Sequence, residues 1–215
     1  MAIDDEVESD GDEERTPEER QMILVAAVLF EAALAPLALM LGEVFEEDPF
    51  ARFDWDWRGA VFGVLATVPM LLFLFVAVRW PIGPLGRIVR IFDRAIAPLL
   101  RDRPISDFVL LSLAAGIGEE LLFRGFLQGT LEGGFNRWTA LGLTATIFGL
   151  LHPITVTYIL VAGFLGAYLG VVWIYSGNLL AVMVAHALYD FVALCLLLRG
   201  RPDRDAGADE ADLHA

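Results

Sequence analysis

The chain has 215 residues, of which 57% are apolar and 20% are charged, and its formal net charge at pH 7 is -14. A soluble globular domain is about 45–50% apolar and about 25% charged. This composition, with a mean hydropathy of +0.61, therefore excludes most soluble classes and favours a membrane protein. The one cysteine, Cys195, excludes a disulfide framework or a cysteine-ligated structural zinc site within the chain.

Acidic residues are concentrated at both ends of the chain. Residues 1–20 contain ten acids and two arginines, and residues 199–215 contain five acids and three arginines. We expect disordered tails at 1–20 and 199–215, on either side of a membrane domain at 21–198. All fifteen basic residues are arginine, which together with the acidic excess favours a prokaryote adapted to high salt. Apart from one arginine-rich loop there is no basic surface, so nucleic acid is not an expected partner.

Six apolar runs are candidates for helices that cross a bilayer core of about 30 Å. They cover residues 21–41, 59–80, 105–128, 138–152, 154–176 and 178–198. The predicted fold is an all-α polytopic membrane protein with about six transmembrane helices and the lipid bilayer as its surroundings. Trp80, Trp138 and Trp173 fall at or near the ends of these runs, where an aromatic belt would place them.

The loop between the second and third runs carries six arginines, from Arg79 to Arg103. Cytoplasmic loops retain arginine, so we expect this loop and both termini on the cytoplasmic side of a prokaryotic plasma membrane. Four of the arginines share one helical face opposite an apolar flank, which predicts an amphipathic helix at the membrane surface. These four are Arg87, Arg90, Arg94 and Arg101. The alternative is a solvated linker broken by Pro98.

Ionisable residues inside apolar runs cost about 2.5–3.5 kcal/mol each to insert, and they are candidates for function. In the second half of the chain they are Glu119, Glu120, Arg124, His152, His186 and Asp190. Together they predict a buried polar site. Glu31, in the first run, is a lone acid, and we expect it to snorkel or to face a polar interior rather than to carry function.

Glu119, Glu120 and Arg124 lie in one predicted helix. Glu120 and Arg124 are four residues apart, so they share a face and can form an ion pair. Glu119 points about 100° away, which leaves it without a cation in its own helix and available as a general base. A buried salt bridge that only fixes helix register is the alternative interpretation of the pair.

Two histidines lie in later apolar runs. Phe148 and His152 are four residues apart and share a helical face, and so do His186 and Asp190. An acid at this spacing can orient the histidine ring, fix its tautomer, or bind a metal beside it. Taken singly, His152 before Pro153 could cap a helix, and the second pair could serve packing. Their occurrence together favours one site.

These three motifs resemble the CAAX prenyl protease and bacteriocin-processing family of intramembrane endopeptidases, which includes the type II CAAX endopeptidases and the lysostaphin-resistance-like proteins. The family pattern is E-E-x-x-x-R, then F-x-x-x-H, then H-x-x-x-N or D, and the match covers about residues 105–198. The resemblance implies an endopeptidase whose partner is a membrane-anchored peptide or protein substrate. A non-enzymatic immunity or scaffold protein on the same fold, and an ion-coupled transporter, are the alternatives.

The resemblance also implies a role for each catalytic candidate. Glu119 would activate the attacking water, and His152 would help to hold that water. The other three, Glu120, His186 and Asp190, would shape the site and stabilise the oxyanion of the tetrahedral intermediate.

Further residues would support the site. Arg124 would fix Glu120, and Phe148 would give structural support. Asp190 stands where many relatives carry asparagine, which can donate to an oxyanion where an ionised aspartate cannot. Asp190 must therefore be protonated, orient His186, or ligate a metal.

The use of a metal is left open by the resemblance, because the family is described both as metalloproteases and as glutamic proteases. In this sequence Glu119, His152 and His186 could form a two-histidine, one-carboxylate zinc site with an open position for water. The cofactor expectation is accordingly either none or zinc.

Overall fold

The structure is a computed structural model that describes residues 15–100 and 102–199. These residues form helices and no strand, which confirms the all-α prediction. The expected tails lie mostly outside the described residues. The first helix begins at Pro17. The prediction of a disordered tail is therefore wrong for residues 17–20, which are helical.

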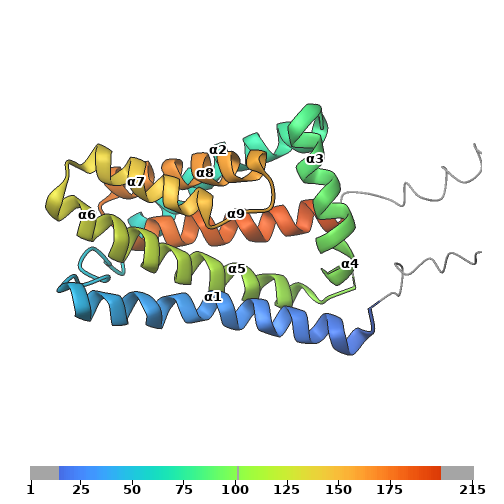
Figure 1. The fold of residues 1–215 in the computed structure, drawn as a ribbon, viewed down its shortest axis with the longest axis horizontal. Coiled ribbons are helices and arrows are strands. Elements are labelled where there is room, and N and C mark those ends of the chain that lie inside the picture. The colour runs from blue at the N-terminus through green and yellow to red at the C-terminus, as the bar shows by residue number, and fades with distance from the viewer. Residues whose placement is uncertain (1–14, 101, 200–215) are drawn as a thin grey trace, which may run out of the picture.

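Six long helical segments follow the six predicted runs and lie roughly along one axis (Figure 1). They are α1 (Pro17–Phe45), α2 (Trp57–Arg79), α5 (Ile105–Glu120) with its continuation, α7 (Arg137–Leu150), α8 (Val156–Ser176) and α9 (Leu179–Arg199). Side-chain caps set where several of them begin. Thr16 and Glu19 form a capping box on α1, and Thr155 accepts from the Tyr158 N–H at the start of α8.

Four of these helices, α1, α2, α8 and α9, are long and apolar enough to cross a membrane. The two other predicted spans fold as helices but differ from that pattern. α5 passes without a break into the π-helix η2 (Leu121–Gln128) and then α6 (Gly129–Gly134), and α7 has only 14 residues. The protein is thus an all-α polytopic membrane protein in which two helical segments depart from a regular span.

Helix α9 lies in the middle of the bundle, where it packs against α2, α5 and α8, while α1 packs on α5 and α7 on α8 (Figure 1). Trp173 is 2% exposed and belongs to this core, so its predicted place in an aromatic belt is wrong. The outer faces of α1 and α2 instead expose large apolar side chains, as lipid-facing helices do. Examples are Leu29, Phe30, Leu65 and Leu72.

The arginine-rich loop crosses one end of the bundle as α3 (Gly83–Ile91), η1 (Phe92–Ile96) and α4 (Ala97–Leu100) (Figure 1). Its arginines Arg87, Arg90 and Arg94 are exposed, while Val89 and Ala97 are buried. The amphipathic helix is therefore confirmed over this segment, and the break at Pro98 is wrong. Arg101 lies outside the described residues, and the position of the segment relative to a membrane remains a prediction.

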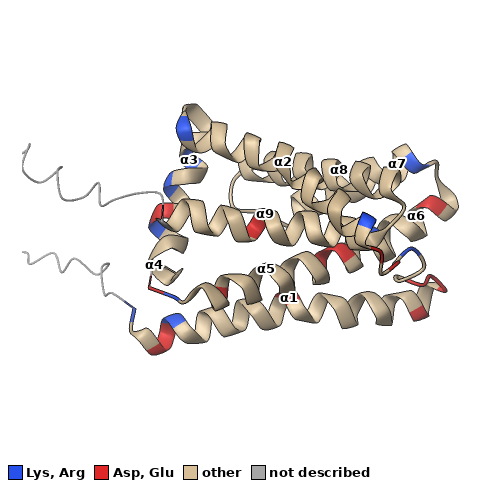
Figure 2. Ribbon diagram, turned by 180° about the vertical axis from the view of Figure 1, so that it is seen from behind, with Lys and Arg blue, Asp and Glu red and all other residues tan. Residues whose placement is uncertain are grey.

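Charged residues gather mainly at the two ends of the bundle, while acidic segments of α5 and α9 lie along its length (Figure 2). At the end crossed by α3 and α4, Arg20 near the start of α1 pairs with Asp102 over 3.7 Å. At the other end the chain before α2 is tied to the α8–α9 turn, since Asn178 Nδ2 donates to the Asp54 carbonyl over 2.9 Å. The acids of α5 and α9 that lie away from both ends are in the apolar part of the bundle, so they need partners inside the protein.

Candidate active site

The Glu120–Arg124 ion pair is completely buried, with both side chains 0% exposed. Arg124 Nη1 donates to Glu120 Oε1 over 2.7 Å, which confirms the predicted pair. Its Nη2 donates over 2.6 Å to the carbonyl oxygen of Gly166 on α8. The Arg124 guanidinium also lies over the Phe148 ring, with Cζ 5.0 Å from the ring centroid. One buried cation therefore links three helical segments.

His186 lies between two carboxyl groups. Its Nδ1 is 2.6 Å from Glu120 Oε1 on α5, and its Nε2 is 3.5 Å from Asp190 Oδ2 one turn further along α9. The first distance is that of a strong, charge-assisted hydrogen bond. Asp190 thus lies where it could orient His186, which is one of the three roles that the sequence left open for it.

Glu119 faces a different histidine. Its Oε1 is 3.9 Å from His152 Nε2, a distance within ion-pair range but too long for a hydrogen bond. The Glu119 side chain is 10% exposed and the His152 side chain 27%. The two adjacent glutamates are therefore divided as their spacing predicts, Glu120 toward Arg124 and Glu119 away from it.

The end of α7 sets the orientation of His152. The last helical residue is Leu150, and the backbone turns before Pro153, whose ring disfavours a continuing helix. His152 Nδ1 lies 2.7 Å from the Phe148 carbonyl oxygen, and the two rings are 4.6 Å apart. A carbonyl oxygen only accepts, so Nδ1 carries the hydrogen and Nε2 faces Glu119.

The proposed zinc ligands are not assembled as a metal site. Within residues 15–100 and 102–199, no group of three His, Cys, Asp or Glu side chains is arranged to hold a metal ion. The ring nitrogens of His186 face the carboxyl groups of Glu120, at 2.6 Å, and Asp190, at 3.5 Å. The donor set in this arrangement does not fit zinc, which needs its ligands within about 2.3 Å of one point.

Two contributors were missed by the sequence reasoning. The four-residue repeat Ala162, Gly166, Gly170 indicates close packing, and a Cβ on Gly166 would indeed lie 3.0 Å from the Phe148 ring. The carbonyl of Gly166 also binds Arg124, a role that no side-chain pattern can reveal. The second is Glu31, which lies beside Glu119 and is not a lone acid. The general rule for intramembrane acids was the signal that pointed to it.

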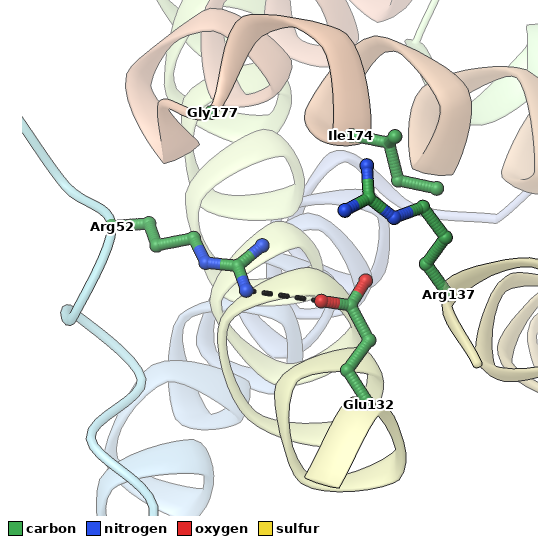
Figure 3. A pocket seen from close by; sticks show the side chains of 5 residues that line it. All are labelled: Arg52, Glu132, Arg137, Ile174 and Gly177. Carbon is green, nitrogen blue, oxygen red and sulfur yellow. Dashed lines mark hydrogen bonds and ion pairs between the residues drawn. The ribbon is translucent and has the colours of Figure 1, made fainter. Parts of the chain in front are cut away.

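A cavity of about 250 Å³ lies away from this cluster, at the end of the bundle opposite α3 and α4 (Figures 1 and 3). Arg52 and Glu132 meet across it with a 3.0 Å ion pair, and Arg137 lies beside them. None of the motif residues lines this cavity. The Arg52–Glu132 ion pair ties the loop before α2 to α6. The cavity is not the candidate active site.

Comparison with known proteins bears on the part of the chain that holds the cluster. The protein-family model described as Type II CAAX prenyl endopeptidase Rce1-like matches residues 101–192. No curated protein and no solved structure matches the chain. The matched segment contains all three motifs, from Glu119 to Asp190, and agrees with the family that they resemble. Over residues 101–192 the chain is therefore similar to the Rce1-like type II CAAX prenyl endopeptidases.

Proposed function

We propose that the protein is an intramembrane endopeptidase that hydrolyses a peptide bond of a membrane-anchored peptide or protein with water activated by Glu119. The observation that carries this proposal is the facing pair of Glu119 and His152, 3.9 Å apart, inside a segment of the protease family. Glu120 is held by Arg124 and His186, whereas no arginine contacts Glu119 among the described residues. Glu119 is therefore the carboxylate available to accept a proton.

Glu119 and His152 together suit a water molecule. Two hydrogen bonds of about 2.8 Å to one water span a separation of 3.9 Å. Because His152 carries its hydrogen on Nδ1, its Nε2 can accept one hydrogen of the water, and Glu119 can accept the other. The water oxygen is then left with lone pairs for attack on a carbonyl carbon.

In the proposed reaction the water oxygen bonds to the scissile carbonyl carbon while its proton passes to Glu119 and the carbonyl electron pair moves onto oxygen. The Nε2–H of His186 is the candidate donor to that oxyanion, because Nε2 lies 3.5 Å from Asp190 Oδ2, too far for an ordinary hydrogen bond, while Nδ1 is held by Glu120. The tetrahedral intermediate then breaks its C–N bond, and Glu119 returns the proton to the leaving amine.

Burial indicates the side from which a peptide would approach. The Glu120 and Arg124 side chains are fully buried, whereas those of His152 and Asp190 are 27% and 29% exposed. A substrate would therefore reach the cluster past His152 and Asp190. We place this reaction in the plasma membrane of a prokaryote, with α3 and α4 on the cytoplasmic side.

Purified full-length protein in proteoliposomes, incubated with a panel of membrane-anchored peptides and analysed by mass spectrometry, tests the proposal. We expect endoproteolytic products from the wild type and from the exposed-site control Glu43→Gln, but not from a variant with both Glu119→Gln and His152→Asn. Cleavage should persist after treatment with a zinc chelator, because the donors do not converge on one point. Products from the double variant, or none from any protein, would contradict the proposal. Loss on chelation with recovery on added zinc would assign a metal instead.

A further inference from the structure

Helix α1 approaches α5 very closely beside the site. A Cβ on Gly118 would collide with the backbone oxygen of Glu31 and would lie 3.3 Å from Leu34 Cβ. Gly118 directly precedes Glu119, so the bare glycine lets the backbone of α1 reach the residue next to the proposed base. The close approach brings a fourth carboxyl group, that of Glu31, to the cluster that already holds those of Glu119, Glu120 and Asp190.

With the backbone of Glu31 against Gly118, the carboxyl group of Glu31 interacts with that of Glu119, and it also interacts electrostatically with His186 and Asp190. The Oε2 atoms of Glu31 and Glu119 are both buried and have no donor among the described groups. Two ionised carboxylates offer acceptors only, so neither can satisfy the other. One proton held between them gives the pair a hydrogen bond, and buried polar atoms are rarely left without one.

The geometry of the neighbouring glutamate shows why Glu119 needs such a partner. Two groups fix Glu120: Arg124 donates a hydrogen bond to its Oε1 over 2.7 Å, and His186 Nδ1 lies 2.6 Å from the same oxygen. Among the described residues, the one cationic side chain within ion-pair distance of Glu119 is His152, at 3.9 Å, and a glutamate side chain has three rotatable bonds. A general base must be held in line with the proton that it removes, so a group that fixes the Glu119 carboxylate affects the rate directly.

We propose that Glu31 is a positioning residue for Glu119, and that a hydrogen bond with one proton shared between the two carboxyl groups holds Glu119 toward His152. This inference rests on the proposed function of Glu119 as the base. It gives the N-terminal helix α1, which lies outside the matched family segment, a part in the active site.

Steady-state cleavage by full-length Glu31→Gln and Glu31→Leu proteins tests the positioning role. Glutamine keeps a donor, so we expect kcat of Glu31→Gln within about threefold of the wild type. Leucine removes the donor, so we expect kcat to fall by about 10- to 100-fold with KM unchanged. Glu43→Leu, an exposed acid on the same helix, should retain wild-type values. Equal kcat for Glu31→Leu and wild type, or no rescue by glutamine, would overturn the inference.

A double-mutant cycle on thermal stability tests the contact without any cleavage assay. Glu31→Leu and Glu119→Leu each leave one buried carboxyl group without its partner, whereas the double variant leaves none. We therefore expect the Tm loss of the double variant to be smaller than the sum of the two single losses. Additive losses would overturn the inference. A wild type that cuts nothing would instead defeat the proposed function, while the cycle would still decide whether the two carboxyl groups are coupled.

Discussion

The two adjacent glutamates differ in what each side chain contacts. Glu120 shares one oxygen between Arg124 at 2.7 Å and His186 at 2.6 Å, and it is fully buried. Glu119 lies beside His152 at 3.9 Å and beside Glu31. The same side chain is thus held by an arginine and a histidine in one position, and in the next it has no arginine partner among the described residues.

Replacement of Arg124 tests the structural half of this division. Arg124→Met leaves Glu120 buried without its cation, and removal of one partner of a buried ion pair costs about 3–5 kcal/mol. We expect a corresponding fall in the free energy of unfolding, measured by denaturation in detergent micelles. Replacement of both charges, with Glu120→Leu and Arg124→Met, should recover part of this loss because no uncompensated charge remains. An unfolding free energy for Arg124→Met equal to that of the wild type would contradict the account.

The sequence predicted the contacts between residues that are close in the chain. The four-residue spacings predict Glu120 with Arg124, Phe148 with His152, and His186 with Asp190, and the structure contains each contact. The sequence could not predict the contacts between different helices. The bond from His186 to Glu120, the Gly166 carbonyl and the place of Glu31 depend on how α1, α5, α8 and α9 pack, which no local spacing determines.

At the scale of elements, two irregular segments deliver the site residues. The α5 helix changes to the π-helix η2 directly after Glu120, and α7 stops at Leu150 so that His152 can turn toward Glu119. π-Helical segments are rare in proteins, and those that occur often lie at functional sites. The early end before Pro153 could be predicted, because a residue that precedes proline disfavours helix. The change to π-helix has no such residue signal, so the sequence predicts only that residues 105–128 form a candidate membrane-spanning helix.

Close packing of α1 on α5 is expected to depend on Gly118. Gly118→Ala forces a Cβ against the backbone of Glu31, so we expect the protein to lose about 1–3 kcal/mol of stability. Gly142 on α7 provides the matched control, since a Cβ there would meet nothing within 4 Å. Gly142→Ala should be neutral or stabilising by up to about 1 kcal/mol, because alanine favours helix. Comparable unfolding midpoints for the two variants would be inconsistent with this contact.

At the scale of the whole molecule, the composition predicted an all-α membrane protein. Contacts of loop residues show which segments share an end of the bundle. The N-terminal end of α1 lies with α3 and α4, as the pair of Arg20 with Asp102 shows, while the loop before α2 lies at the opposite end (Figure 1). The number of regular spans was harder to predict, because hydropathy registers apolar length and not the interruption of a helix. Within the part of the chain that the structure describes, four helices meet the length and hydropathy of a span, against six predicted runs.

Cysteine accessibility tests the orientation of these ends. In a Cys195→Ser background, a cysteine replacing Trp55, which is 86% exposed, should react with a membrane-impermeant maleimide added to intact cells. A cysteine replacing Arg87 on α3 should react only after the cells are permeabilised, because arginine-rich segments stay in the cytoplasm. The reverse pattern of labelling would place α3 and α4 outside.

The role of Glu119 as the base is tested most directly by kcat and thermal stability measured together on Glu119→Gln in reconstituted full-length protein. Glutamine has nearly the same shape but accepts no proton from water, so kcat should fall by about 100- to 10,000-fold. The unfolding midpoint should stay at or above that of the wild type, since the variant removes a buried carboxylate without an arginine partner. A Glu119→Gln protein that folds as stably as the wild type and cuts at the same rate would contradict the account.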